Sequence, residues 1–268
     1  MDYTLYNLLK GPIIRKFTPL TRGIDYKRRV ITAVSVQELP MAPYIQPGEL
    51  VLTTASGAAQ DPSVFDRILE EAGSVGASAV LFGFPKPLEV PEHIITGAEQ
   101  LGLPLIILSK GQLFASVQKG VNQALQEART EPYLRLQNDL FNAYFDGASL
   151  GEAADTIARF LDAEVAIAGF GDQILAATDG FRKATGIFEI RVNEDRLGEL
   201  LLQSGTELSK EAGSLIRQYI SYPLTLWINQ IRVEKRTEAR IRSDFVLRLI
   251  HSGDDPAVLQ EAGQLNIP

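Results

Sequence analysis

The run GELVLTT, at residues 48–54, decides the fold of the first half of the chain, because Leu50, Val51 and Leu52 follow one another without a polar interruption. A short continuous apolar run of this kind predicts a strand that is buried on both faces, as in a parallel sheet covered by helices. Similar runs lie at residues 30–36, 78–82 and 104–108. Together the four runs predict one parallel sheet.

Amphipathic helical patterns separate these runs. One begins at Asp61 and Pro62 and ends at Gly76, which are ordinary start and stop signals of a helix. Another begins after Pro91 and ends before the fourth run. This alternation of strands and helices predicts an α/β domain with a parallel sheet over residues 1–110.

Long helices are expected on both sides of a second domain. Ser109 and Gln112 have the spacing of a capping box, and a further helical stretch follows Pro132. We interpret residues 111–147 as a helical connector. Residues 208–251 are also helical in pattern, and Pro223 is expected to kink that stretch.

The pattern changes in residues 148–232. An amphipathic helix follows the capping-box pair Ser149 and Glu152. Four short strands come next, at residues 164–170, 173–178, 187–192 and 197–203, and turn-forming pairs separate them. We predict an α+β domain with a small antiparallel sheet and helices on one side.

Residues 233–268 are interpreted as the helical beginning of a further domain that is cut short in this chain. The reason is that a new apolar element begins at the end of the chain.

Composition and charge exclude several classes of protein. The 268 residues, 45% of them hydrophobic, suffice for about two globular domains. The absence of cysteine excludes disulfides, thiolate metal sites and cysteine nucleophiles. With no export signal and no apolar run long enough for a membrane span, we expect a cytoplasmic protein without a membrane partner. A net charge of −7 repels DNA phosphates.

Several strings in the first domain occur together in a known family. They are RV at residues 29–30, VSVQE at 34–38, GELVLTT at 48–54, GASAVL at 76–81 and LGLPLI at 101–106. In these strings, over residues 4–125, the chain resembles the N-terminal domain of the purine-catabolism-regulator (PucR) family of bacterial transcription factors. Residues 149–232 resemble a GAF-type sensor domain, and residues 240–250 resemble the helical entry to the family's central domain.

The resemblance implies a regulator that senses a metabolite linked to nitrogen, purine or amino-acid catabolism. Family members usually end with a helix-turn-helix segment that binds DNA, and no stretch of this sequence matches one. The resemblance therefore implies DNA contact only through a C-terminal region absent from this chain. The partners that we expect of these residues are a small-molecule effector and a second copy of the chain.

The candidate ligand site is the end of the second predicted strand, with Thr53, Thr54, Ser56 and Gly57. Open α/β sheets bind ligands beyond the carboxyl ends of their strands, near helix N-termini that favour negative charge. Small hydroxyls and a glycine at this place are suited to a carboxylate or a urea-like group. The alternative is that these residues only cap the strand and its turn.

The second domain offers weaker candidates. Phe170, Thr178 and Arg191 lie on or at the ends of its predicted strands. Because no convergent polar set accompanies the small apolar residues 166–169, a purely structural domain is favoured over a ligand-binding one. The charged run at residues 232–242 mixes both signs at helical spacing, which favours a solvated helix over a DNA contact.

Catalysis is not expected. The only two histidines, His93 and His251, lie far apart in the sequence with no triad-like setting, and clustered metal ligands are absent.

The leading hypothesis is thus the sensing and dimerisation portion of a transcription regulator, without cofactor or metal. A small-molecule-metabolising enzyme and a pure dimerisation scaffold are the alternatives. Dimerisation is expected through the helices of residues 110–147 and 208–251, which carry large apolar side chains such as Tyr144 and Trp227.

Overall fold

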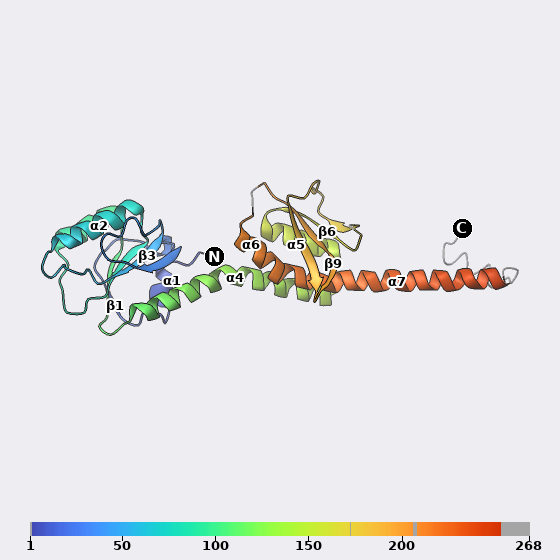
Figure 1. The fold of residues 1–268 in the computed structure, drawn as a ribbon, viewed down its shortest axis with the longest axis horizontal. Helices are drawn as coiled ribbons and strands as arrows, with labels where there is room; N and C mark the ends of the chain where they lie inside the picture. The colour runs from blue at the N-terminus through green and yellow to red at the C-terminus, as the bar shows by residue number, and fades with distance from the viewer. Residues whose placement is uncertain (1, 172, 206–207, 253–268) are drawn as a thin grey trace. The chain divides into compact units, whose positions relative to one another are not determined.

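The computed structural model describes residues 2–171, 173–205 and 208–252. Its contacts divide the chain into two compact units, residues 1–132 and 133–268 (Figure 1). The sequence interpretation instead placed boundaries at residues 110 and 147. The last predicted segment, residues 233–268, lies in part outside the described residues.

The first unit contains a five-stranded sheet of order β1-β5-β4-β3-β2. Its strands are β1 (Phe17–Pro19), β2 (Ala33–Val36), β3 (Glu49–Thr53), β4 (Ala79–Phe82) and β5 (Leu105–Leu108). Strands β2 to β5 pair in parallel, which confirms the parallel sheet that the four apolar runs predicted. The antiparallel edge strand β1 was not predicted, because its three residues contain no apolar run and end in a proline.

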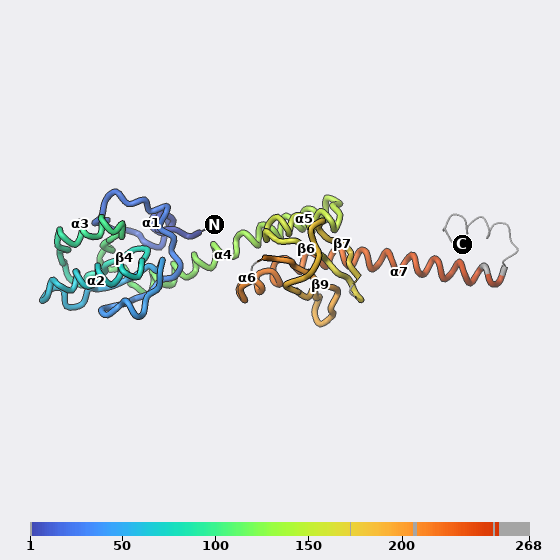
Figure 2. Tube along the Cα trace, turned by 90° about the horizontal axis from the view of Figure 1, so that it is seen from above, coloured from blue at the N-terminus to red at the C-terminus, as the bar shows by residue number. Residues whose placement is uncertain are grey.

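Helices cover both faces of this sheet. Helices α2 (Ser63–Val75) and α3 (Glu92–Leu101) pack on the face that carries Val51 and Val80. Helix α1 (Leu5–Lys10) and the beginning of α4 (Phe114–Phe145) pack on the face that carries Leu50 and Leu52. Successive strand residues point to opposite faces, so two covered faces require the uninterrupted apolar runs seen in the sequence. Figure 2 shows α2 and α3 beside β4.

The long helix α4 differs from its prediction. It begins at Phe114 and continues through Pro132 to Phe145 as one helix, where two stretches were expected. The expected capping box does not form at its start, because the side chain of Gln112 donates instead to the carbonyl of Ile13 at 2.6 Å.

The second unit contains a four-stranded antiparallel sheet of order β7-β6-β9-β8. Its strands are β6 (Glu164–Ala168), β7 (Ile174–Ala177), β8 (Gly186–Val192) and β9 (Asp195–Gln203). Helix α5 (Leu150–Leu161) precedes the sheet, and the capping box of Ser149 and Glu152 is present at its start. The antiparallel sheet and this capping box confirm the sequence prediction.

Three consecutive helical segments complete the second unit: α6 (Lys210–Leu215), a π-helical turn (Ile216–Ile220) and α7 (Ser221–Ser252). Pro223 was expected to kink this stretch, and the π-helical turn ends at Ile220, three residues before it. Proline has no N–H to donate to the carbonyl four residues earlier, that of Tyr219. The side chain of Gln137 donates to this carbonyl at 3.2 Å and thereby replaces the missing bond.

Several residues expected at a dimer interface pack within the second unit itself. The rings of Tyr144 and Trp227 meet edge to face at 5.1 Å, and Trp227 is only 4% exposed and donates to the carbonyl of Ala148. Phe145, in contrast, is 77% exposed. None of the described helices combines the length and the apolar character that crossing a membrane requires.

Candidate functional site

The loop after β3 follows the strand at its carboxyl end and leads into α2. At the end of β3, the carbonyl of Thr53 accepts a hydrogen bond from the amide of Gly83 at 2.9 Å. The parallel pairing with β4 stops there, and the backbone leaves the sheet. The sequence analysis placed a carboxylate-binding site in this loop. The loop's hydroxyls and amides converge on a single carboxylate, and that carboxylate belongs to the chain itself.

Glu38 supplies this carboxylate. Its Oε1 accepts hydrogen bonds from the amide of Thr54 at 2.8 Å and from the Thr54 hydroxyl at 2.6 Å. Its Oε2 accepts from the Thr53 hydroxyl at 2.9 Å and from the amide of Ser56 at 3.0 Å. We call Thr53, Thr54 and Ser56, with these four donors, the carboxylate cradle. Each carboxylate oxygen of Glu38 thus accepts two hydrogen bonds.

Register explains why Glu38 reaches the cradle. In the parallel pair β2–β3, Val36 lies opposite Leu52, and the amide of Gln37 extends the pairing by donating to the Leu52 carbonyl at 2.9 Å. Two residues beyond Val36, the chain reaches Glu38 at the level of Thr54. The carboxyl ends of neighbouring parallel strands share one edge of a sheet, so the two groups meet there.

The cradle favours the ionised form of Glu38. Burial of the half-buried side chain by itself raises the pKa, but the hydrogen bonds from Thr54, Ser56 and Thr53 outweigh burial and bring the pKa below its ordinary value of 4.5. Hydrogen bonds to a charged carboxylate stabilise that charge. The site therefore holds an anion in the first unit.

Backbone geometry completes the loop. Ala55 adopts a left-handed conformation, with φ of +52°, although it carries a Cβ and is buried. Its amide donates to the Thr53 hydroxyl at 3.1 Å. Gly57 is not part of the cradle: it has φ of +92°, and its carbonyl accepts from the amides of Gln60 and Asp61. Of the four predicted site residues, three form the cradle and Gly57 forms the turn.

Sequence reasoning gave no role to Glu38, although the residue lies in the string VSVQE on which the family resemblance depends. The available signal was the common edge of the parallel sheet. An acidic residue two positions after one parallel strand lies near hydroxyl residues at the end of the neighbouring strand, once the two strands are assigned as neighbours.

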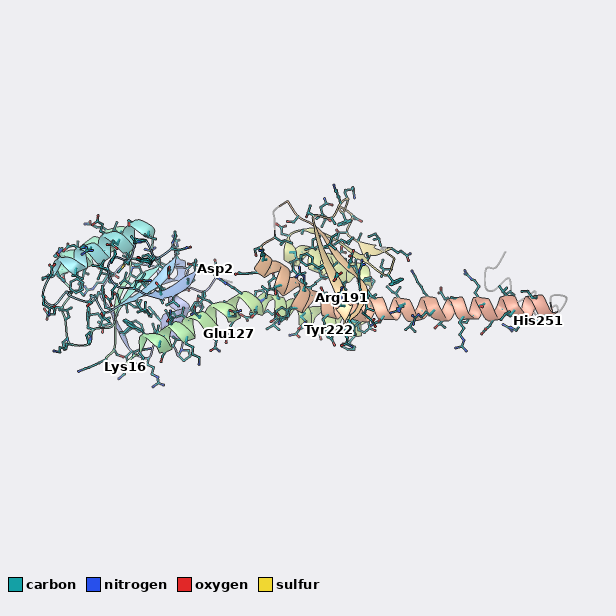
Figure 3. All side chains as sticks on the ribbon, viewed as in Figure 1. Asp2, Lys16, Glu127, Arg191, Tyr222 and His251 are labelled. Carbon is teal, nitrogen blue, oxygen red and sulfur yellow. The ribbon has the colours of Figure 1, made fainter. Side chains whose placement is uncertain are left out.

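The two histidines have separate partners. The ring of His93 lies 3.1 Å from the carboxylate of Asp66, and both side chains are exposed. The ring of His251, near the end of α7 (Figure 3), contacts the carbonyl of Leu247 in the same helix. Across the described residues, no group of three or more histidine and carboxylate side chains is placed to hold a metal ion.

The second-unit candidates have separate roles. The hydroxyl of Thr178 donates to Glu164 and accepts from the amide of Val165, which ties β6 to the residue after β7. Arg191 forms an exposed ion pair with Glu189 at 2.7 Å on the sheet (Figure 3). Phe170 lies in the β6–β7 turn and is 87% exposed. The structure does not bring these three into one site.

Comparison with known proteins gives one family. Residues 7–125 match the sequence model of the Purine catabolism regulatory protein-like family, PucR. This similarity of residues 7–125 supports a PucR-type domain in the first unit and suggests a regulatory domain of a transcription regulator. The match includes Glu38 and the whole cradle. No match was found among curated proteins.

One solved structure with detectable similarity contains the CBS and DRTGG domains of the regulatory region of Clostridium perfringens pyrophosphatase, complexed with the activator diadenosine tetraphosphate. It is 16% identical, with a TM-score of 0.28. The match covers 38% of this chain and 42% of that one, so the chain spans less than half the length of that structure.

Proposed function

We propose that the chain is the effector-sensing and dimerisation portion of a bacterial transcription regulator that controls nitrogen, purine or amino-acid catabolism. The carboxylate cradle is the observation that carries the proposal. It lies at the carboxyl end of a parallel strand, where α/β proteins bind their ligands. The PucR-type match of residues 7–125 supports a regulatory rather than a catalytic role.

In this proposal Glu38 occupies the cradle when the effector is absent. The effector presents a carboxylate or a urea-like group to the hydroxyls of Thr53 and Thr54 and the amides of Thr54 and Ser56, and takes the place of the Glu38 side chain. An effector carboxylate replaces that of Glu38 oxygen for oxygen and satisfies all four donors, whereas the single oxygen of a urea-like group accepts only some of these bonds; in either case Glu38 moves into water. The segment that connects β2 to β3 loses its attachment to the loop and changes conformation.

The same proposal assigns the other partners. A second copy of the chain binds through the helices, as a two-fold dimer suits a palindromic DNA site. Because the net charge of −7 repels DNA phosphates, we assign DNA contact to a part of the regulator outside these 268 residues. The second unit serves as a GAF-like module, and no cofactor is needed for the exchange of acceptors at the cradle.

A thermal-shift screen of carboxylate- and urea-containing nitrogen metabolites tests the sensing role. A ligand at 100 times its dissociation constant stabilises the folded chain by about 2.7 kcal/mol. Glu38→Ala removes the internal competitor, so we expect the effector to bind this variant about tenfold more tightly. Thr54→Val removes one donor and should weaken binding. Glu70→Ala, an exposed carboxylate on α2, is the matched control and should bind as the wild type does.

The outcomes separate the proposal from its alternatives. A metabolite that stabilises all variants equally would place the effector site elsewhere. A complete absence of thermal shifts would favour the dimerisation scaffold. Turnover of a metabolite, detected as product formation, would favour the enzyme.

A further inference from the structure

A cavity in the second unit lies apart from the carboxylate cradle. Its volume is about 390 Å³, within the range of pockets that hold small organic molecules. The β6–β7 turn, the beginning of β9 and one face of α7 form its walls. Figure 1 shows β9 and α7 meeting in this unit.

The inner wall of the cavity is apolar. Leu197 and Ile228 belong to the buried core of the second unit, and Leu175 and Ile231 pack against that core. Phe170 contributes its ring to the cavity from the β6–β7 turn, where it is largely in water. Removal of this exposed ring from water is favourable, because burial of apolar surface lowers the free energy. The apolar wall and the exposed ring therefore favour a bound molecule with an apolar body.

The outer wall is cationic. Four basic side chains and one carboxylate, Asp195, line the cavity, although the chain as a whole has a net charge of −7. Arg196 pairs with Glu199 at 2.7 Å. Lys235 donates to the neutral amide of Gln173 at 2.9 Å. Arg232 and Arg236 make no ion pair with any residue that the structure describes.

Helix α7 arranges these groups along its length. Positions four apart lie on the same helix face, and two such rows line the cavity: Ile228, Arg232 and Arg236, and Ile231, Lys235 and Ala239. Each row is apolar at its beginning and carries a cation one turn later. The cavity therefore has an apolar end in the core and a cationic end at the surface.

We propose that this cavity is a second binding site, which takes an organic carboxylate with an aromatic or branched apolar body. The guanidinium groups of Arg232 and Arg236 bind the carboxylate, since planar guanidinium donors match its two oxygens. The apolar body lies against Leu175, Leu197 and Ile228, and Phe170 covers it. Such a ligand attaches the β6–β7 turn to α7. This site goes beyond the proposed function and does not depend on the cradle.

The test uses the whole chain and the fluorescent probe 1-anilinonaphthalene-8-sulfonate, an aromatic anion. We expect the probe to bind with enhanced fluorescence, 2-naphthoate to displace it, and the uncharged 2-naphthamide to displace it at least tenfold less well. Arg232→Gln with Arg236→Gln should weaken probe and naphthoate binding at least tenfold. Ala239→Leu, which fills the cavity, should have a similar effect.

Arg240→Gln with Arg242→Gln is the matched control, because it removes the same charge from the same helix outside the cavity and should leave both affinities within twofold. Circular dichroism melts verify that each variant is folded. Thr54→Val should leave probe binding unchanged, so this result is independent of the effector screen at the cradle. Equal affinity of the cavity variants and the control, equal displacement by the amide, or displacement by a short DNA duplex as strong as that by naphthoate would each overturn the proposal.

Discussion

At the residue scale, the conformation of the loop after β3 depends on the ionised carboxylate of Glu38. Its four hydrogen bonds connect the segment after β2 with the loop that leads to α2. The left-handed backbone of Ala55 costs roughly 1–2 kcal/mol for a residue with a Cβ. The bonds to Glu38 oppose this cost, so the cradle and the strained residue depend on each other.

Glu38→Gln tests this dependence. An amide offers one accepting oxygen and directs an NH₂ group toward donors, so at least two of the four bonds are lost. We expect the free energy of unfolding at pH 7 to fall by about 1–3 kcal/mol, the range for part-buried donors left without an acceptor. Urea denaturation measures the change. Glu70→Gln, on the exposed face of α2, should change it by less than about 0.5 kcal/mol, and an equal effect of the two substitutions would contradict the role of Glu38.

The lowered pKa of Glu38 also makes stability depend on pH. A carboxyl whose pKa is lower in the folded state than in the unfolded state contributes stability that is complete above the unfolded value. For Glu38 that value is near 4.5, and the contribution is lost as the pH falls through the lower folded pKa. We therefore expect the wild type to lose more stability than Glu38→Gln when the pH is lowered through this window. Urea midpoints for both proteins, measured at a series of pH values below 5, test the difference. Parallel curves would contradict it.

At the element scale, the strands buried on both faces were the most predictable. The uninterrupted apolar runs at β3, β4 and β5 indicated strands of a covered sheet, and the structure shows these strands almost completely buried. Edge strand β1 and the continuous α4 were less predictable, since β1 depends on pairing with β5 and α4 on packing that tolerates Pro132. Three cradle residues could be found from strand position alone. Glu38 required the strand order, which only tertiary structure provides.

The bond between Gln137 and the carbonyl of Tyr219 compensates for Pro223, and this leads to a prediction about coupling. Gln137→Ala should lower the free energy of unfolding by about 0.5–1.5 kcal/mol, the net value of one hydrogen bond. In a Pro223→Ala background, the amide of residue 223 can donate to the carbonyl of Tyr219. Gln137→Ala should then lower the free energy of unfolding by less than it does in the wild type. A double-mutant cycle by urea denaturation measures the coupling, and equal costs in the two backgrounds would show that the bond is not a replacement for the missing N–H.

At the scale of the whole molecule, the sequence predicted two domains of different sheet type because the apolar pattern changes between them. The parallel and the antiparallel sheet both follow from that change. The boundary was harder to place. Helix α4 contributes Val117 and Val121 to the core of the first unit and Leu136 and Leu140 to that of the second. A helix shared in this way shows no break in its own sequence.

Dimerisation is the prediction that belongs to the whole molecule. Of the apolar side chains on the helices, Phe145 remains 77% exposed and Tyr222 58% exposed. Phe141 lies one helical turn before Phe145 and meets the ring of Tyr222 at 6.0 Å. We call Phe141, Phe145 and Tyr222 the aromatic patch. A two-fold interface uses such a patch twice, and each large side chain contributes about 1.5–3 kcal/mol when buried. This is sufficient to offset an association cost at the lower end of about 4–15 kcal/mol.

Sedimentation at micromolar concentration should therefore give twice the chain mass of 29.4 kDa. Phe145→Glu with Tyr222→Glu should give the monomer with its fold intact, because both side chains are exposed in the single chain. Charged residues at Tyr144 and Trp227 would be a poorer test, since those rings pack against each other within the unit and their loss would unfold it. Ile187→Glu, at a 57% exposed position on the open face of the second sheet, is the matched control and should leave the dimer unchanged. A wild-type monomer, or a dimer lost only through Ile187→Glu, would show that the helices are not the interface.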